Sequence, residues 1–168
     1  MRSRTAAALL ALLAFAAAAD GAVHFRTVDV YMNSDAPLAA WQVEVRYDRA
    51  KVKIVGLEGG EAGRDAAWRE PPHYDRRGMS RGRIVVAAFV DDDAKATTGR
   101  ARVARLHVQI ELPEGGDAEG VIRSMTVRLV AAAQAGGERI APKVELSVAE
   151  VALPEVVEPR RAEPGPVF

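Results

Sequence analysis

The side chains that could perform chemistry are few in this sequence, and they do not form a catalytic pattern. None of the five serines lies in a Gly-x-Ser-x-Gly segment, which presents a nucleophile on a sharp turn. Cysteine is absent, so thiol catalysis and thiolate zinc sites are excluded. Carboxylates are plentiful, but none is singled out as a member of the opposed pair that glycoside hydrolysis needs. The sequence therefore favours a binding protein over an enzyme.

Two polar clusters are candidates for a ligand or a metal. His73 lies beside Tyr74 and Asp75 and could contribute to a binding site, but no His-x-x-x-His or paired-carboxylate spacing supports a metal. Asp91, Asp92 and Asp93 form the densest acidic run, whose oxygens would suit calcium. The run lacks the glycine and the closing glutamate of an EF-hand loop. We therefore expect a solvated strand end and no cofactor, with calcium near these aspartates as the weaker alternative.

The first 19 residues resemble an export leader. Arg2 and Arg4 precede a run rich in alanine and leucine at residues 6–19, and Ala17 and Ala19 supply a small-x-small cleavage pattern. This layout predicts a signal peptide and a secreted or periplasmic protein. An uncleaved anchor is the alternative, although the run is shorter than the roughly 20 residues that span a bilayer. No second apolar stretch follows, so no membrane span is expected after cleavage.

The charge balance argues against nucleic acid as a partner. The whole chain has 23 basic and 23 acidic side chains. Removal of the leader with its two arginines leaves 21 basic side chains, which is slightly acidic. Arg76, Arg77, Arg81 and Arg83 cluster near Asp75, and we interpret this group as a solvated loop, because nucleic-acid binding usually needs an undiluted basic patch.

Alternation of apolar and polar residues predicts an all-β domain. The clearest strand is residues 38–48, in which a period of two places Trp41, Val43 and Val45 on one face of a sheet. Six further strands are expected, at residues 24–32, 51–57, 83–90, 101–111, 121–131 and 143–148. Turn-forming residues separate them, including 33–35 after the first strand. Seven such strands predict an antiparallel β-sandwich.

The remaining segments complete the domain organisation. Residues 61–81 are predicted as a long loop with one helical turn at 62–68. Trp68 and Tyr74 in this loop either form a stacking platform for a sugar or cap one end of the sandwich. Residues 151–168 are rich in proline and glutamate, which predicts a disordered tail. The expected division is a signal peptide at 1–19, one sandwich domain at 20–150 and this tail.

Three segments resemble the cohesin family. Residues 37–54 contain a strand ending in Tyr47-Asp48, a short turn and a second strand; residues 82–93 and 98–108 resemble the following two strands. The resemblance covers roughly residues 23–148. It implies a jelly-roll sandwich of the cohesin and carbohydrate-binding-module superfamily, without catalytic activity. Cohesins bind dockerin domains through one sheet face.

These observations give two hypotheses for the function. The first is a non-catalytic, extracytoplasmic protein-binding module, with a dockerin-type domain among the candidate partners. The second is a module on the same fold that binds polysaccharide. The candidate ligand-binding residues are Gln42, Glu44 and Arg46, on the polar face of the clearest strand, and Trp68, His73 and Tyr74, in the long loop.

Overall fold

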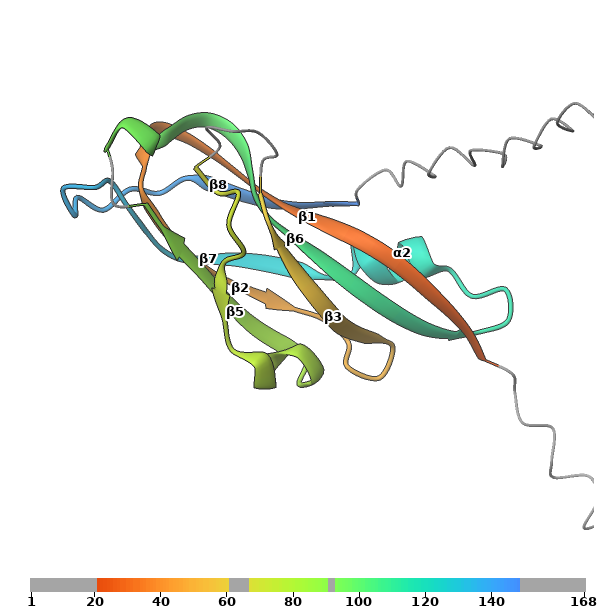
Figure 1. The fold of residues 1–168 in the computed structure, drawn as a ribbon. Coiled ribbons are helices and arrows are strands. Elements are labelled where there is room, and N and C mark those ends of the chain that lie inside the picture. Colours follow the sequence, from red (N-terminus) through yellow and green to blue (C-terminus); the bar gives the residue numbers. More distant parts are fainter. Residues whose placement is uncertain (1–20, 61–66, 91–92, 149–168) are drawn as a thin grey trace, which may run out of the picture.

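The computed structural model describes residues 21–60, 67–90 and 93–148, which form two antiparallel β-sheets packed face to face (Figure 1). The predicted signal peptide, the predicted tail from residue 151, most of the predicted helical turn at 62–68, and Asp91 and Asp92 lie outside these residues. The expected all-β architecture of two packed sheets is confirmed. Within the described residues, no helix is long and apolar enough to cross a membrane.

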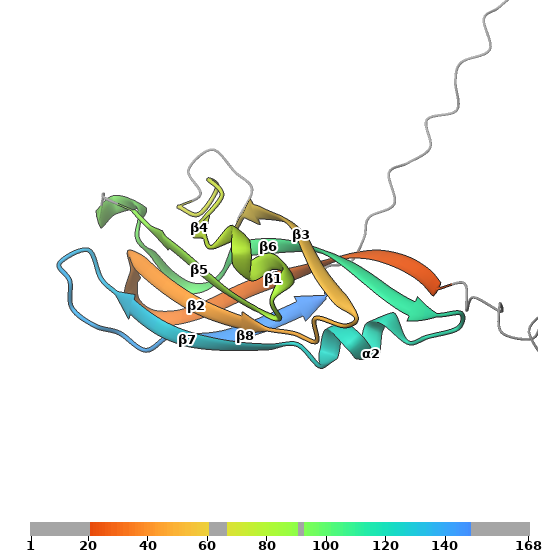
Figure 2. The same cartoon turned by 90° about the horizontal axis from the view of Figure 1, so that it is seen from below.

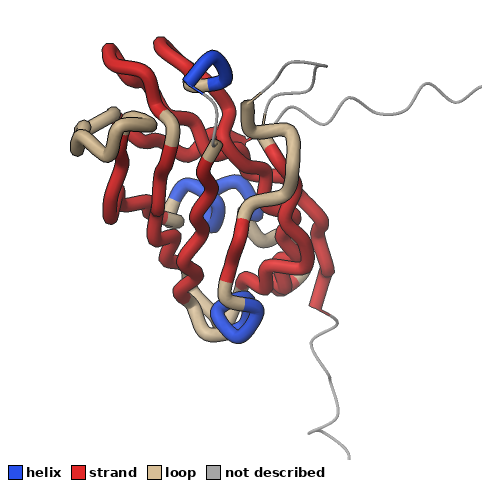
Figure 3. The backbone as a smooth tube through the Cα atoms, turned by 60° about the vertical axis from the view of Figure 1, so that its left-hand side comes forward, coloured by secondary structure: helices blue, strands red, loops and turns tan. Residues whose placement is uncertain are grey.

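Each sheet has four strands. Sheet A has the order β3 (Val52–Gly59), β6 (Thr97–Pro113), β1 (Gly21–Leu38) and β8 (Lys143–Val148). Sheet B has the order β4 (His73–Tyr74), β5 (Arg83–Phe89), β2 (Ala40–Arg46) and β7 (Thr126–Ala133). Three short helices complete the described fold: η1 (Arg76–Ser80), η2 (Asp93–Lys95) and α2 (Ala118–Arg123). Figure 3 shows these short helices (blue) against the strands (red) that make up most of the described chain.

The structure corrects several of the expected boundaries: β1 and β6 are longer than predicted, and the predicted long loop at 61–81 contains β4 and η1. The predicted turn at residues 33–35 is wrong, because β1 continues to Leu38 and pairs with β6 through this segment; a register shift after Ser34 absorbs the irregularity. The predicted strand at 121–131 is also wrong in its first part. Asp117 caps α2 by accepting a hydrogen bond from the backbone N–H of Gly120, and Ile122 on this helix is buried in the core.

The core lies between the sheets and centres on the inner face of β2. Trp41, Val43 and Val45 are buried there, as the alternation predicts. Trp68 is also buried, with 2% of its surface exposed, and its ring meets that of Trp41 edge to face at 6.0 Å. The Trp68 indole N–H donates to the Thr97 hydroxyl at 3.1 Å, which satisfies its polar group inside the core.

Glycines allow the segment that carries Trp68 to approach sheet A closely. The Gly60 N–H donates to the Trp68 carbonyl at 2.6 Å. A Cβ atom at Gly59 would lie 2.0 Å from the Arg69 carbonyl oxygen and 2.5 Å from the Trp68 carbonyl oxygen, so no other residue fits there without moving the backbone. The Gly59-Gly60 pair, which the sequence presents only as a strand end, therefore brings Trp68 to the core.

Replacing Trp41 by alanine should lower the free energy of unfolding by about 3–5 kcal/mol, because a large buried ring leaves a cavity between the sheets. Chemical denaturation measures the change. Lys53→Ala, at an exposed position of β3, is the control and should have an effect within about 0.5 kcal/mol. Equal stability of the Trp41 variant and the parent would contradict the facing of β2.

Candidate binding site

The outer face of sheet B carries four rows of side chains that the strand register sets side by side. At one end, Ala40 lies opposite Phe89 and Ala133, and the next row places Gln42 between Ala87 and Ala131. His73 extends this second row, because β4 pairs it with Ala87. The face thus has an apolar end, built from alanines and Phe89.

The other end of the same face is charged. Glu44 lies between Val85 and Arg128, and Arg46 lies between Arg83 and Thr126. We call Glu44, Arg46, Arg83 and Arg128 the arginine cluster. Its arginines are largely exposed, whereas Glu44 has only 1% of its side chain exposed. The sequence placed Glu44 among the exposed polar residues of the strand, and this is corrected: it lies on the outer face but under a cover of arginine side chains.

Hydrogen bonds hold the cluster together around the Glu44 carboxylate. One oxygen accepts a bond of 2.7 Å from Arg46 Nε, and the other accepts a bond from Arg83 Nε. The second oxygen also lies 3.6 Å from Arg128 Nη2. Arg46 and Arg83 stand directly opposite each other on neighbouring strands, where two like charges repel. The carboxylate offsets this repulsion and fixes the orientation of both guanidinium groups.

These bonds change the acid strength of Glu44. The hydrogen bonds from Arg46 and then Arg83 favour the ionised carboxylate and lower the pKa of Glu44 from its ordinary 4.5 to about 2. The cluster therefore holds three positive charges and one negative charge through the whole neutral and mildly acidic range.

A groove of about 350 Å³ occupies the apolar end of the face, and we call it the alanine groove. Alanine methyl groups form much of its floor, so the side chains leave the surface hollow. Phe89, 67% exposed, lies on one side and stacks its ring on His73, with centroids 6.2 Å apart and planes inclined by 12°. Gln42 and Arg139 supply polar groups. Further lining residues are Ala40, Trp41, Ala87, Ala88, Ala131, Ala132, Ala133 and Gly137.

The structure brings four of the six sequence-proposed site residues to this face. Gln42 and His73 line the alanine groove, and Glu44 and Arg46 belong to the arginine cluster. Trp68 does not reach it, because its ring is in the core. Tyr74 is partly buried and packs against the same core. The two rings named as a sugar platform therefore take the packing role that the sequence left as their alternative.

Phe89 and the alanines are site residues that sequence reasoning missed. The signal was present in residues 83–90, which are apolar at nearly every position. In a two-layer sandwich one sheet face looks to solvent, so a strand that is apolar on both faces must leave one apolar row outside. Alanine is also a poor strand former, and three adjacent strands place it on the outer face here.

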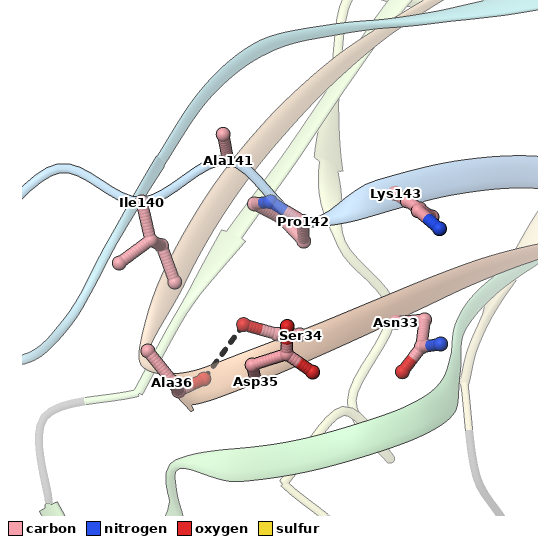
Figure 4. A pocket seen from close by; sticks show the side chains of 8 residues that line it. All are labelled: Asn33, Ser34, Asp35, Ala36, Ile140, Ala141, Pro142 and Lys143. Carbon is pink, nitrogen blue, oxygen red and sulfur yellow. Dashed lines mark hydrogen bonds between the residues drawn. The ribbon is translucent and has the colours of Figure 1, made fainter.

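A second hollow, of about 310 Å³, lies between the end of β1 and the segment that leads into β8 (Figure 4). β8 pairs with β1 only from Lys143 onward, and Pro142 before it has no N–H for the ladder. Ser34 in this hollow is buried, and its hydroxyl donates to the Ala36 carbonyl at 2.6 Å. A hydroxyl bonded to a carbonyl has no general base to activate it, so Ser34 is not poised as a nucleophile.

Among the residues that the structure describes, no group of three or more histidine, aspartate or glutamate side chains is arranged to hold a metal ion. Asp91 and Asp92, the residues of the calcium alternative, fall outside that part of the chain, and the side chain of Asp93 is not described. Comparison with protein-family models, curated proteins and solved structures gave no match to this chain.

The Glu44 carboxylate should make stability depend on acid pH. Its pKa is lower in the folded chain than in the unfolded chain, so its stabilisation is complete above about pH 4.5 and is lost as the pH falls toward 2. In Glu44→Gln this component is missing. We therefore expect the difference in unfolding midpoint between parent and variant to be largest near pH 6 and to shrink steadily below pH 4.5.

Thermal unfolding followed by circular dichroism from pH 7 to pH 2.5 measures this difference. Glu114→Gln, at an exposed position in the turn after β6, is the matched control and should follow the parent. A Glu44→Gln curve parallel to that of the parent over the whole range would show that the arginines do not hold the carboxylate ionised.

Proposed function

We propose that this chain is a non-catalytic, extracytoplasmic binding module that holds a protein partner on the outer face of sheet B. The observation that carries the proposal is the juxtaposition, on one exposed face, of the alanine groove and the arginine cluster. The resemblance of residues 23–148 to cohesins supports a partner-binding sheet face on a jelly-roll sandwich. The leader-like residues 1–19 support a site of action outside the cytoplasm.

The apolar end of the face suits an anchor from a partner. Phe89 is among the most exposed large apolar side chains of the described residues, and it borders a hollow rather than a crowded surface. Exposed apolar surface of this kind marks interaction sites, and an aromatic ring beside a pocket is a typical binding hot spot. A partner that places one or two apolar side chains in the groove would bury Phe89 and the alanine methyl groups.

The charged end of the face selects the partner's charge. Together the groove and the cluster hold the four guanidinium groups of Arg46, Arg83, Arg128 and Arg139 against the one carboxylate of Glu44. The chain as a whole is neutral, so this face is locally positive. A complementary partner surface would be acidic next to an apolar anchor, because charge complementarity raises the association rate and excludes basic surfaces.

Polysaccharide remains the second candidate, and a specific observation favours it. The Phe89 ring is exposed and is nearly parallel to His73, which gives a flat aromatic surface on which a sugar ring could stack. This platform replaces the one that Trp68 and Tyr74 were expected to form. A single exposed phenylalanine is a small platform, and the arginines around it have no role in stacking on a neutral glycan.

The protein-binding proposal predicts that a double variant on this face loses the partner. Phe89→Ser with Arg128→Glu removes the anchor and reverses one charge, while both positions are exposed and the fold should remain intact. Val55→Ser with Lys53→Glu makes the same chemical changes at exposed positions of sheet A and is the matched control. Quantitative mass spectrometry of proteins captured from the extracytoplasmic fraction compares the two with the parent.

A protein that is retained by the parent and the control, and lost at least tenfold with the sheet B variant, would support the proposal. Equal capture by both variants would contradict it. Insoluble cellulose, chitin and xylan test the alternative, and we expect no retention on them. Retention that Phe89→Ala abolishes would establish the polysaccharide function and overturn protein binding as the role of this face.

A further inference from the structure

The two ends of β1 differ in how they are paired. β6 pairs with β1 along its whole length, from Gly21 opposite Pro113 to Leu38 opposite Thr97. On its other side β1 meets β8, but that ladder covers only Val28 to Asn33. Within the described residues, Gly21 to Thr27 therefore form an open strand edge, and Figures 1 and 2 show β1 and β6 extending together beyond the end of β8.

This open edge carries exposed apolar side chains. Val23 is 51% exposed and Phe25 is 63% exposed, and both lie on the outer face of sheet A in alternation with His24 and Arg26. An open edge with apolar side chains pairs readily with other chains, and natural proteins generally cover such an edge. The open edge of β1 therefore needs a segment that covers it.

The register of β8 identifies a candidate. Val148 lies opposite Val28, and each step forward along β8 corresponds to one step back along β1. If the same ladder continued, Glu150 would lie opposite Arg26, Val151 opposite Phe25 and Leu153 opposite Val23. These are one pair of opposite charges and two apolar pairs, which are the combinations that stabilise neighbouring strands.

The match is specific to this register and to this length. A shift by one residue would place Glu150 opposite Phe25 or Thr27, and it would turn Val151 and Leu153 to the other face of the sheet. Pro154 would then lie opposite Ala22, next to the first residue of β1, and proline cannot continue a ladder of hydrogen bonds. The apolar alternation of the segment thus ends where the edge ends.

We infer that residues 149–153 add to the open edge of β1 and extend β8 in its existing register, within the same chain. Arg26 is suitably placed for this pairing: its guanidinium donates to the Phe25 carbonyl at 2.9 Å and lies 3.8 Å from Glu119, too far for a strong ion pair. The inference does not depend on the function proposed for sheet B.

An engineered disulfide tests the pairing directly, because the chain has no cysteine of its own. Directly opposed residues of antiparallel strands have Cα atoms about 4.5–5.5 Å apart, which is within the range that a disulfide bridges. Phe25→Cys with Val151→Cys should therefore form an intramolecular disulfide in the full chain. Phe25→Cys with Ala152→Cys is the matched control, since residue 152 would point to the opposite face.

Oxidation in mild redox buffer, followed on non-reducing gels, gives three distinguishable results. An intramolecular bond that forms at least ten times faster in the 25/151 pair than in the 25/152 pair supports the inference. Equal rates for the two pairs overturn it, because a segment without register would sample both positions. A disulfide-linked dimer also overturns it and would show that the edge takes the segment of a second copy.

Truncations give an independent readout. Removal of residues 154–168 should leave the unfolding midpoint nearly unchanged, because Pro154 ends the proposed strand. Removal of residues 149–168 should lower the midpoint by about 3–8 °C, since it also removes the pairing partners of Val23 and Phe25. Equal midpoints for the two truncated chains would contradict the inference.

Discussion

The structure depends on the alternation of β2 in the centre of sheet B. Its inner row, Trp41, Val43 and Val45, is buried against the other sheet and meets Trp68 in the core. Because successive side chains on a strand point to opposite faces, burial of this row fixes Gln42 and Glu44 on the outer face. A slip of one residue would exchange the two rows, so the same packing energy that stabilises the fold also holds the site in register.

Buried carboxylates organise the outer faces of both sheets. Glu44 on sheet B accepts hydrogen bonds from Arg46 and Arg83, and Asp29 on sheet A accepts two from Arg105, at 2.6 and 2.9 Å. Each acid is covered by the arginines that it binds, so its charge is compensated where it is buried. The two groups of charges differ in their surroundings. On sheet B the arginines are largely exposed and adjoin the alanine groove, which makes that cluster suitable for recognition.

The sequence predicted what depends on local pattern and missed what depends on tertiary packing. Alternation in β2 identified the inward row and placed Gln42, Glu44 and Arg46 together. It could not show that Glu44 is buried, because the arginines that cover it come from three strands. The burial of Trp68 was equally hidden, since the loop that carries this tryptophan reaches the core through the close approach of its backbone to Gly59. Phe89 was missed because residues 83–90 are apolar on both faces of the strand, and the packing of the two sheets decides which face is exposed to solvent.

The two sheets differ in length, and this separates the two surfaces. The described strands of sheet B have at most eight residues, whereas β1 has 18 and β6 has 17, so sheet A projects beyond its partner. α2 lies under this projection, with Ile122 in the core and Glu119 near Arg26 (Figure 2). The open edge of β1 is part of the projection, and the alanine groove is on the opposite outer face of the sandwich. The β1 edge and the face of sheet B that carries the alanine groove are therefore separate surfaces of the sandwich.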